Sequence, residues 1–102
     1  MRRGTTPTYT IVMNGVETDD LEDICLAFYQ TKSDHELNLH FSEGRVTLTL
    51  DGAFATLTQE ETNAFEKGTL KRQIKLKFHD GTVWSSDIEK ETVYDVIHEE
   101  VL

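Results

Sequence analysis

The chain has 102 residues, of which 37% are hydrophobic and 28% are charged, and its formal net charge is −9 from 19 acidic and 10 basic residues. This length predicts one domain with one core, and the composition is too apolar for a disordered chain and too polar for a membrane protein. The acidic balance argues against nucleic acid as a partner, because phosphate contacts need Lys and Arg.

The first seven residues include Arg2 and Arg3 and lack the apolar stretch of a secretory signal. No apolar run is long enough for a transmembrane segment, so no membrane partner is expected. We therefore expect a cytosolic product in which residues 1–7 form a flexible basic arm, 8–93 form the folded domain and 94–102 form a C-terminal tail. The two arginines are candidates for docking on an acidic patch of another subunit.

Apolar residues alternate at period two directly after the arm, a pattern typical of half-buried strands. It predicts strands at 8–13 and at about 23–30, the second with Ile24, Leu26 and Phe28 on one face. The acidic stretch 17–23 between them predicts a loop, with one helical turn as an alternative. Its carboxylates are of the kind that bind calcium, but the EF-hand spacing and central glycine are missing, so a solvated loop is the preferred interpretation.

Three further apolar runs predict two hairpins with strands at about 37–41, 46–50 and 53–57. X-Gly pairs favour two-residue turns, here Glu43-Gly44 and Asp51-Gly52. The pairs across these turns are then Leu39 with Leu48, Leu48 with Ala55, and Leu50 with Ala53. This register places the apolar residues on one face. Phe54 alone points outward and is a candidate interface residue.

A capping box is predicted at Thr58, whose hydroxyl can accept from the amide of Glu61 while the carboxylate of Glu61 reaches back. A short helix through about Phe65 follows. Gly68 is suited to the left-handed position that ends a helix.

The last hairpin is predicted from the need to avoid burying an unpaired Asp87. A three-residue loop at 79–81, with Gly81 in a left-handed bulge position, achieves this. The residues expected to turn inward are Trp84, Ser86 and Ile88. Those expected to turn outward are Asp87, Glu89 and Glu91, beside a row of lysines at Lys71, Lys75 and Lys77. This lysine row is either paired with those acids across the strands or is a contact surface for an acidic neighbouring subunit.

These elements together predict an all-β fold, an immunoglobulin-like two-sheet β-sandwich of about seven strands with one short helix between the fifth and sixth. A small barrel is the alternative. The strand order does not follow from the sequence.

The candidates for chemistry are few. The four histidines, at positions 35, 40, 79 and 98, form no metal-binding or catalytic spacing. Cys25 lies beside the acidic stretch, which raises a thiol pKa, and Ser85-Ser86-Asp87 lies in no nucleophile elbow. We therefore expect no enzyme activity, no metal or other cofactor, and no small-molecule substrate.

The opening Met1-Arg2-Arg3-Gly4-Thr5-Thr6-Pro7-Thr8 resembles that of small uncharacterised proteins encoded by phages and prophages of gut Firmicutes. The segments 57–62, 73–76, 80–82 and 85–88 are also similar to that family. The resemblance implies a virion structural component of the tail, baseplate or head surface, made in the host bacterial cytoplasm and then carried in the virion. It implies other virion or prophage proteins as partners, or copies of the chain itself.

Two functions therefore remain open. The first is a structural or assembly protein that acts through protein–protein contacts, with a candidate interface at Arg2, Arg3, Phe54, Lys71, Lys75 and Lys77. The alternative is a carbohydrate- or host-surface-binding module, which would use exposed aromatic side chains from among Tyr29, Phe54 and Trp84. Burial of Trp84 in the predicted register counts against the alternative.

Overall fold

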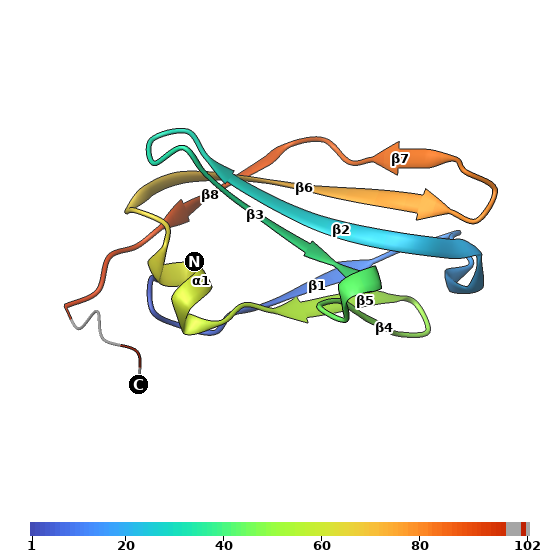
Figure 1. Cartoon of the computed structure of the whole chain (residues 1–102), viewed down its shortest axis with the longest axis horizontal. Coiled ribbons are helices and arrows are strands. Elements are labelled where there is room, and N and C mark those ends of the chain that lie inside the picture. The colour runs from blue at the N-terminus through green and yellow to red at the C-terminus, as the bar shows by residue number, and fades with distance from the viewer. Residues whose placement is uncertain (98–100, 102) are drawn as a thin grey trace.

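Two antiparallel sheets face each other in the computed structural model, which describes residues 1–97 and 101 (Figure 1). The strands of these residues are β1 (Thr8–Val12), β2 (Leu21–Gln30), β3 (His35–His40), β4 (Thr47–Leu48), β5 (Gly52–Thr56), β6 (Gly68–Phe78), β7 (Val83–Ser85) and β8 (Glu89–Val93). The helical elements are the 3₁₀ turns η1 (Thr18–Asp20) and η2 (Phe41–Glu43) and the helix α1 (Gln59–Asn63). The predicted two-sheet sandwich, with a short helix between the fifth and sixth strands, is confirmed.

The smaller sheet has the strand order β1-β5-β4, and the larger has β3-β2-β6-β7, with β8 also paired to β6. The predicted seventh strand is therefore split into β7 and β8, which follow each other along one edge of β6. The second strand lies in the larger sheet between β3 and β6. In immunoglobulin constant domains the second strand lies in the sheet of the first, fourth and fifth, so the order here differs from theirs.

The core lies between the sheets and is filled from both of them, as the alternation predicts. Fully buried side chains come from the larger sheet, the residue after β5 and the segment after α1: Ile24, Phe28, Leu39, Leu57, Phe65 and Leu70. Gln30, at the end of β2, is also fully buried. Its side-chain amide donates to the carbonyl of Glu66, and its side-chain oxygen accepts from the Glu66 amide at 2.8 Å. These bonds join β2 to the segment between α1 and β6.

The predicted hairpin at Glu43-Gly44 is wrong. β3 pairs with β2, with Leu39 opposite Leu26, and the chain then crosses to the other sheet through η2. Gly44 has φ 77° and donates its amide to the Phe41 carbonyl. Alternation cannot distinguish a neighbouring strand from a facing strand, because apolar residues of both point at the same core.

The second hairpin exists, but its turn is Leu50-Asp51 and not Asp51-Gly52. The Thr49 amide donates to the Gly52 carbonyl at 2.8 Å, and Leu48 lies opposite Ala53. This register differs from the prediction by two residues. Because side chains alternate with a period of two, each residue of β4 and β5 still points to its predicted face. Leu50, however, is at the tip of the turn and fully exposed. Gly52 is the first residue of β5, and the position requires glycine because an added Cβ would lie 1.8 Å from the Ile11 carbonyl oxygen.

The capping box at Thr58 is confirmed, with both reciprocal hydrogen bonds to Glu61 present. The helix ends earlier than predicted, at Asn63, and Phe65 is buried beyond it. Gly68 does not end the helix. It begins β6 with φ 130°.

The three-residue loop of the last hairpin is confirmed. Gly81 has φ 90°, and Trp84 lies opposite Leu76 on the inner face. Beyond Ser86 the prediction is wrong, because Arg72 lies opposite Glu89 and Leu70 opposite Glu91. The register changes by one residue between β7 and β8, so Glu89 and Glu91 share the inner face with Arg72 and Leu70. The expected inward position of Ile88 is also wrong, since this side chain is 60% exposed and borders Lys71 on the outer face.

The physical reason for this change lies in Arg72. Arg72 has the same parity as Leu70 and Ile74, and an acidic residue opposite it on that face can pair with its guanidinium. The extra residue places Glu89 3.1 Å from it. Ser86 supports the irregular stretch, since its hydroxyl oxygen accepts from the Ile74 amide at 3.0 Å.

Candidate functional site

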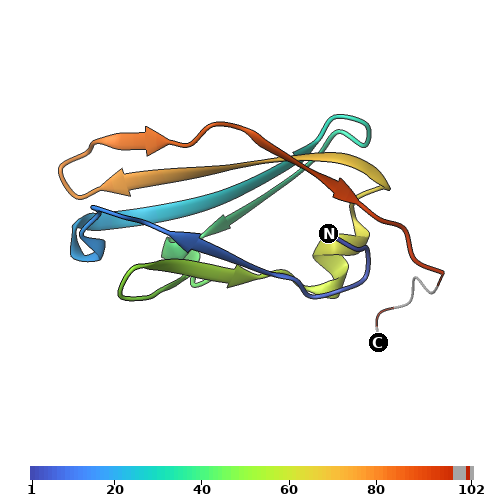
Figure 2. The same cartoon turned by 180° about the vertical axis from the view of Figure 1, so that it is seen from behind.

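The two flanks of the sandwich, where the sheet edges lie, are built differently. On one flank the chain crosses between the sheets from β3 through η2 to β4. On the opposite flank β1 and β7 are sheet edges, and among the described residues β1 pairs only with β5 and β7 only with β6 (Figure 2). We call these the closed flank and the open flank.

An apolar groove of about 540 Å³ runs along the open flank between the two sheets. Its lining from β1 and the following turn is Ile11, Val12, Met13, Asn14 and Val16, and its lining from the larger sheet and its hairpin is Ile74, Leu76, Phe78, Thr82 and Trp84. Val12 is 64% exposed and Trp84 is 52% exposed, and Val83 beside Trp84 is 56% exposed. The inner face predicted for Trp84 is correct, but here that face is open to solvent.

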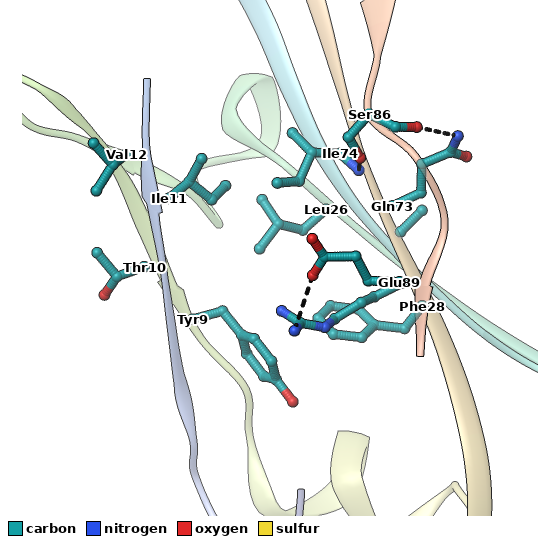
Figure 3. A pocket seen from close by; sticks show the side chains of 12 residues that line it. Tyr9, Thr10, Ile11, Val12, Leu26, Phe28, Gln73, Ile74, Ser86 and Glu89 are labelled. Carbon is teal, nitrogen blue, oxygen red and sulfur yellow. Dashed lines mark hydrogen bonds and ion pairs between the residues drawn. The ribbon is translucent and has the colours of Figure 1, made fainter. Parts of the chain in front are cut away.

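A second hollow of about 250 Å³ continues the groove toward α1 (Figure 3). Figure 3 shows Tyr9 and Ile11 of β1 on one side and Ile74, Ser86 and Glu89 on the other. The Arg72 guanidinium lies 5.7 Å from the centre of the Tyr9 ring and 3.1 Å from the Glu89 carboxylate. The Tyr9 hydroxyl donates to Glu91.

Burial, followed by this bond to Glu91, raises the pKa of Tyr9 above its ordinary value of 10.0. The phenol is therefore a neutral hydrogen-bond donor at physiological pH. The groove thus combines an apolar part around Trp84 with a polar part around Tyr9, Arg72 and Glu89. Such an arrangement can bind a segment that offers apolar side chains and a few hydrogen-bonding groups.

The closed flank is joined by polar contacts. Arg45, just after η2, makes a bidentate pair with Glu61 at 2.7 and 2.8 Å. Hydrogen bonding from Arg45 lowers the pKa of Glu61, burial opposes this, and the Thr58 amide lowers it further. Burial raises the pKa of Asp23, but bonds from the Ser42 amide and His40 lower it by more, so the net shift is downward. These carboxylates fix η2 and the helix N-terminus to the strands beside them.

The predicted basic arm lies folded against the body of the protein. The Arg3 amide donates to the Tyr94 carbonyl, the Tyr94 amide donates to the Met1 carbonyl, and Arg2 forms a parallel bridge with Tyr94. The Arg2 guanidinium lies 5.4 Å from the centre of the Tyr94 ring, and Arg3 forms an ion pair with Asp95 at 2.9 Å. Both arginines therefore have partners within the chain. The tail after Tyr94 is described only at 95–97 and 101.

The other predicted interface residues are on two different faces. Phe54 is 37% exposed on the outer face of the smaller sheet, between Thr10 and Thr47. Lys71, Lys75 and Lys77 are on the outer face of the larger sheet. Their predicted pairing with Glu89 and Glu91 is wrong, because those acids are on the inner face. Lys77 instead lies 3.4 Å from Glu22.

The residues considered for chemistry are scattered in the described structure. The Nδ1 of His40 lies 2.8 Å from Asp23, His35 packs edge-on against Phe65, His79 is in the last hairpin loop, and His98 is outside the described residues. Burial, then Asp23, raises the pKa of the Cys25 thiol, as predicted from the acidic stretch. Within residues 1–97 and 101, no group of three or more His, Cys, Asp or Glu side chains is arranged to hold a metal ion.

The sequence reasoning missed the open flank. The inner position of Arg72 was one available signal, because a charged residue among inward apolar residues indicates either a partner or solvent nearby. The exposure of Trp84 had no signal, since Trp84 follows the alternation of core residues. Val12 differs, because it has the outward parity of Thr8 and Thr10, opposite to Tyr9 and Ile11.

No family model matches the chain, and no curated protein or solved structure matches it either. In the described part of the chain, no helix has the length and apolar character needed to span a membrane.

Proposed function

We propose that this chain is a non-enzymatic structural or assembly protein of a phage or prophage, which works through contacts with other virion proteins or with itself. The observation that carries the proposal is the open flank, where an apolar groove lies between the sheets and Val12 and Trp84 of its lining are more than half exposed. Contiguous exposed apolar surface of this kind typically marks a protein-interaction site.

The backbone at the rim of the groove supports the same function. β1 ends its sheet with the sequence Thr-Tyr-Thr-Ile-Val, and this strand contains no charge, no proline and no bulge. Sheet edges without such protection tend to pair with a further strand. A strand added there would gain main-chain hydrogen bonds from β1 and would place alternate side chains in the groove.

The opening octapeptide supports a phage or prophage setting, because it resembles small proteins encoded there. In a phage particle, the chain would serve as a contact protein of the tail, baseplate or head surface.

The experiment is co-purification with particles. We expect the chain to be found by mass spectrometry in virions purified from an induced host, and the tagged chain to capture virion proteins from that lysate. The double variant Val83→Ser, Trp84→Ser should lose this capture. Leu50→Ser removes another exposed apolar side chain, at the tip of the β4–β5 hairpin, and should keep it. Absence of the chain from particles, together with no capture of virion proteins, would refute the proposal.

The second candidate is a carbohydrate- or host-surface-binding module. The exposure of Trp84 favours it, because sugar rings stack on accessible aromatic side chains and the predicted burial of this residue does not occur. Tyr29 and Phe54 are on the outer faces of different sheets, so they cannot join Trp84 in one site. Signal on a glycan array that is lost in Trp84→Ala would favour this function, and a blank array would exclude it for the glycans tested.

A further inference from the structure

One side of the β1 main chain forms a regular ladder with β5. The carbonyl of Pro7 and the amide of Met13, at the two ends of β1, are hydrogen-bonded to residues flanking β5, at 3.0 and 2.8 Å. In an antiparallel pair, residues two apart along a strand direct their main-chain groups to the same side. The main-chain groups of Tyr9 and Ile11 therefore also point to β5.

The other side of β1 is free. Thr8, Thr10 and Val12 have the opposite parity, so their amides and carbonyls point away from β5. Within the described residues β1 pairs with no second strand. The side chains of these three residues are exposed on the outer face. The edge of the smaller sheet thus presents three amide donors and three carbonyl acceptors, and another extended strand is the partner that satisfies them.

The other sheet edges of residues 1–97 and 101 are protected. β3 carries Glu36, and β8 carries Glu89, Lys90 and Glu91. β4 and β7 carry no charge but have only two and three residues. Charged side chains and short length are the usual protections of a sheet edge. β1 has five residues and neither protection, so a further strand is expected to pair here.

We infer that the partner of β1 is the β1 strand of a second copy, paired antiparallel about a two-fold axis at Thr10. The three-stranded sheets of the two copies then join into one sheet. This register pairs every residue of β1 with a residue of the other β1. The inference rests on the proposed function and specifies one of its contacts as a contact between copies of the chain.

The residue pairs in this register suit a sheet. Thr10 faces Thr10 of the other copy and Thr8 faces Val12, at the positions with free main-chain groups, so about six main-chain hydrogen bonds form. Tyr9 faces Ile11 on the inner side. Pairs of threonines and pairs of an aromatic with a β-branched residue stabilise neighbouring strands. No pair contains a charge, so two copies of net charge −9 meet at a strand that adds no repulsion.

A second copy suits this edge better than a single added strand. A single strand would leave a new free edge beside β1. Two-fold pairing instead satisfies the free groups of both copies and leaves β4, with two residues, at each end of the joined sheet. It also gives Val12, which is 64% exposed, a neighbour in Thr8 of the other copy.

The size of the contact is that of a weak dimer. The five paired residues span about 17 Å and the two sheets are about 10 Å apart, so each copy would cover on the order of 300–500 Å². This area is below the roughly 800 Å² per partner of a standard interface. We therefore expect a Kd in the micromolar range, on the order of 10–100 µM.

The first measurement is amide hydrogen exchange of the wild-type chain, followed by NMR at about 10 µM and about 1 mM protein. The amides of Thr8, Thr10 and Val12 should exchange several-fold more slowly in the concentrated sample, because they bond only in the dimer. The amides of Tyr9 and Ile11 should be slow in both samples. Exchange of the first three amides that is equally fast in both samples would overturn the inference.

The deciding measurement places charges on the two-fold axis. T10K and T10D each put like charges directly opposite each other in a dimer, so each variant alone should associate roughly tenfold more weakly than wild type in sedimentation velocity. An equal mixture of T10K and T10D should form a heterodimer, because opposite charges then face each other. The matched control T47K changes an exposed threonine on the same outer face, at the β4 edge, and should dimerise like wild type.

Circular dichroism melts check that the variants fold, and the exchange measurement on the wild type decides the case without them. Dimerisation of T10K as strong as wild type, or a mixture of T10K and T10D that does not associate, would overturn the inference. Particle association is measured separately. A monomeric chain whose Thr8, Thr10 and Val12 amides are protected only by a captured virion protein would refute the dimer and leave the proposed function standing.

Discussion

On the closed flank the chain passes from β3 through η2 into β4, whereas on the open flank β1 and β7 end their sheets with no connection between them. The closed flank buries Leu39 and Val46 and is joined by the Arg45–Glu61 pair. The open flank exposes Val12, Val83 and Trp84. Val12 and Val83 are on outer faces, but Trp84 has the inward parity of a core residue. The same inward alternation therefore gives core at Leu39 and accessible surface at Trp84.

The difference shows what a covering segment contributes to a sandwich of this size. A side chain that points between two sheets is removed from water only if something closes the gap at the edge. The η2 crossover does this on the closed flank. Substitutions of buried residues should therefore affect stability, and substitutions of the exposed groove residues on the open flank should affect binding.

The largest effect is expected for Leu39→Ala on the closed flank. Leu39 is 1% exposed, and its truncation should lower the free energy of unfolding by about 2–5 kcal/mol through lost burial and the cavity left behind. Urea titration followed by circular dichroism measures this change. The matched control is Leu50→Ala, at the exposed hairpin tip, which should change stability by less than about 0.5 kcal/mol. Equal effects at the two positions would contradict the assigned burial.

Gly52→Ala tests how β1 is held on the open flank. The added methyl would lie 1.8 Å from the Ile11 carbonyl oxygen, which is backbone and cannot rotate away. We expect a loss of about 1–3 kcal/mol in stability as β1 shifts from β5. Hydrogen exchange should then speed up at the amides that join β1 and β5. An unchanged exchange pattern with wild-type stability would show that β1 is not packed this closely.

Glu61→Gln should change the pH dependence of stability. The pKa of Glu61 is lowered in the folded protein from its ordinary 4.5, so the ionised form stabilises the fold above pH 4.5, and this stabilisation is lost as the pH falls through the lowered value. Gln still serves a capping box, and Arg45 is partly exposed, so the loss at pH 7 should be about 0.5–1 kcal/mol. The free energies of unfolding of both proteins should converge as the pH falls through this lowered pKa. A constant difference at all pH values would contradict the ion-pair explanation.

The smallest effect on stability is expected for Trp84→Ala. Because Trp84 is half exposed on an open groove, the free energy of unfolding should fall by less than about 1 kcal/mol. Capture of virion proteins should nevertheless fall. A loss of stability as large as that of Leu39→Ala would show that the open flank is part of the core in solution.

The strand faces could be predicted from the sequence because they depend on local alternation. Ile24, Leu26 and Phe28 are buried together, and Phe54 points outward, as the period of two requires. Local turn and cap chemistry was equally predictable. Thr58 caps α1, and Gly81 takes the left-handed position of the last loop, because these depend on residues three or four apart.

Most of the candidate surface could not be predicted from local pattern. The lysine row was placed on the correct face, but its partners were assigned wrongly because a one-residue change beyond Ser86 reverses every later side chain. The position of that change depends on Arg72 and Glu89, 17 residues apart. Arg2 and Arg3 were expected in a free arm, and they lie against the segment after β8, more than 90 residues away.

The sequence by itself determined a two-layer β fold, the faces of most strands, the helix cap and the last loop, since short-range stereochemistry decides each of them. Tertiary structure decided which strands are neighbours, where η2 closes the sandwich and where the flank stays open. The physical reason is that the hydrophobic effect has no direction. The hydrophobic effect favours burial of both Leu39 and Trp84. Which of the two side chains is shielded from solvent depends on where distant segments of the chain pack.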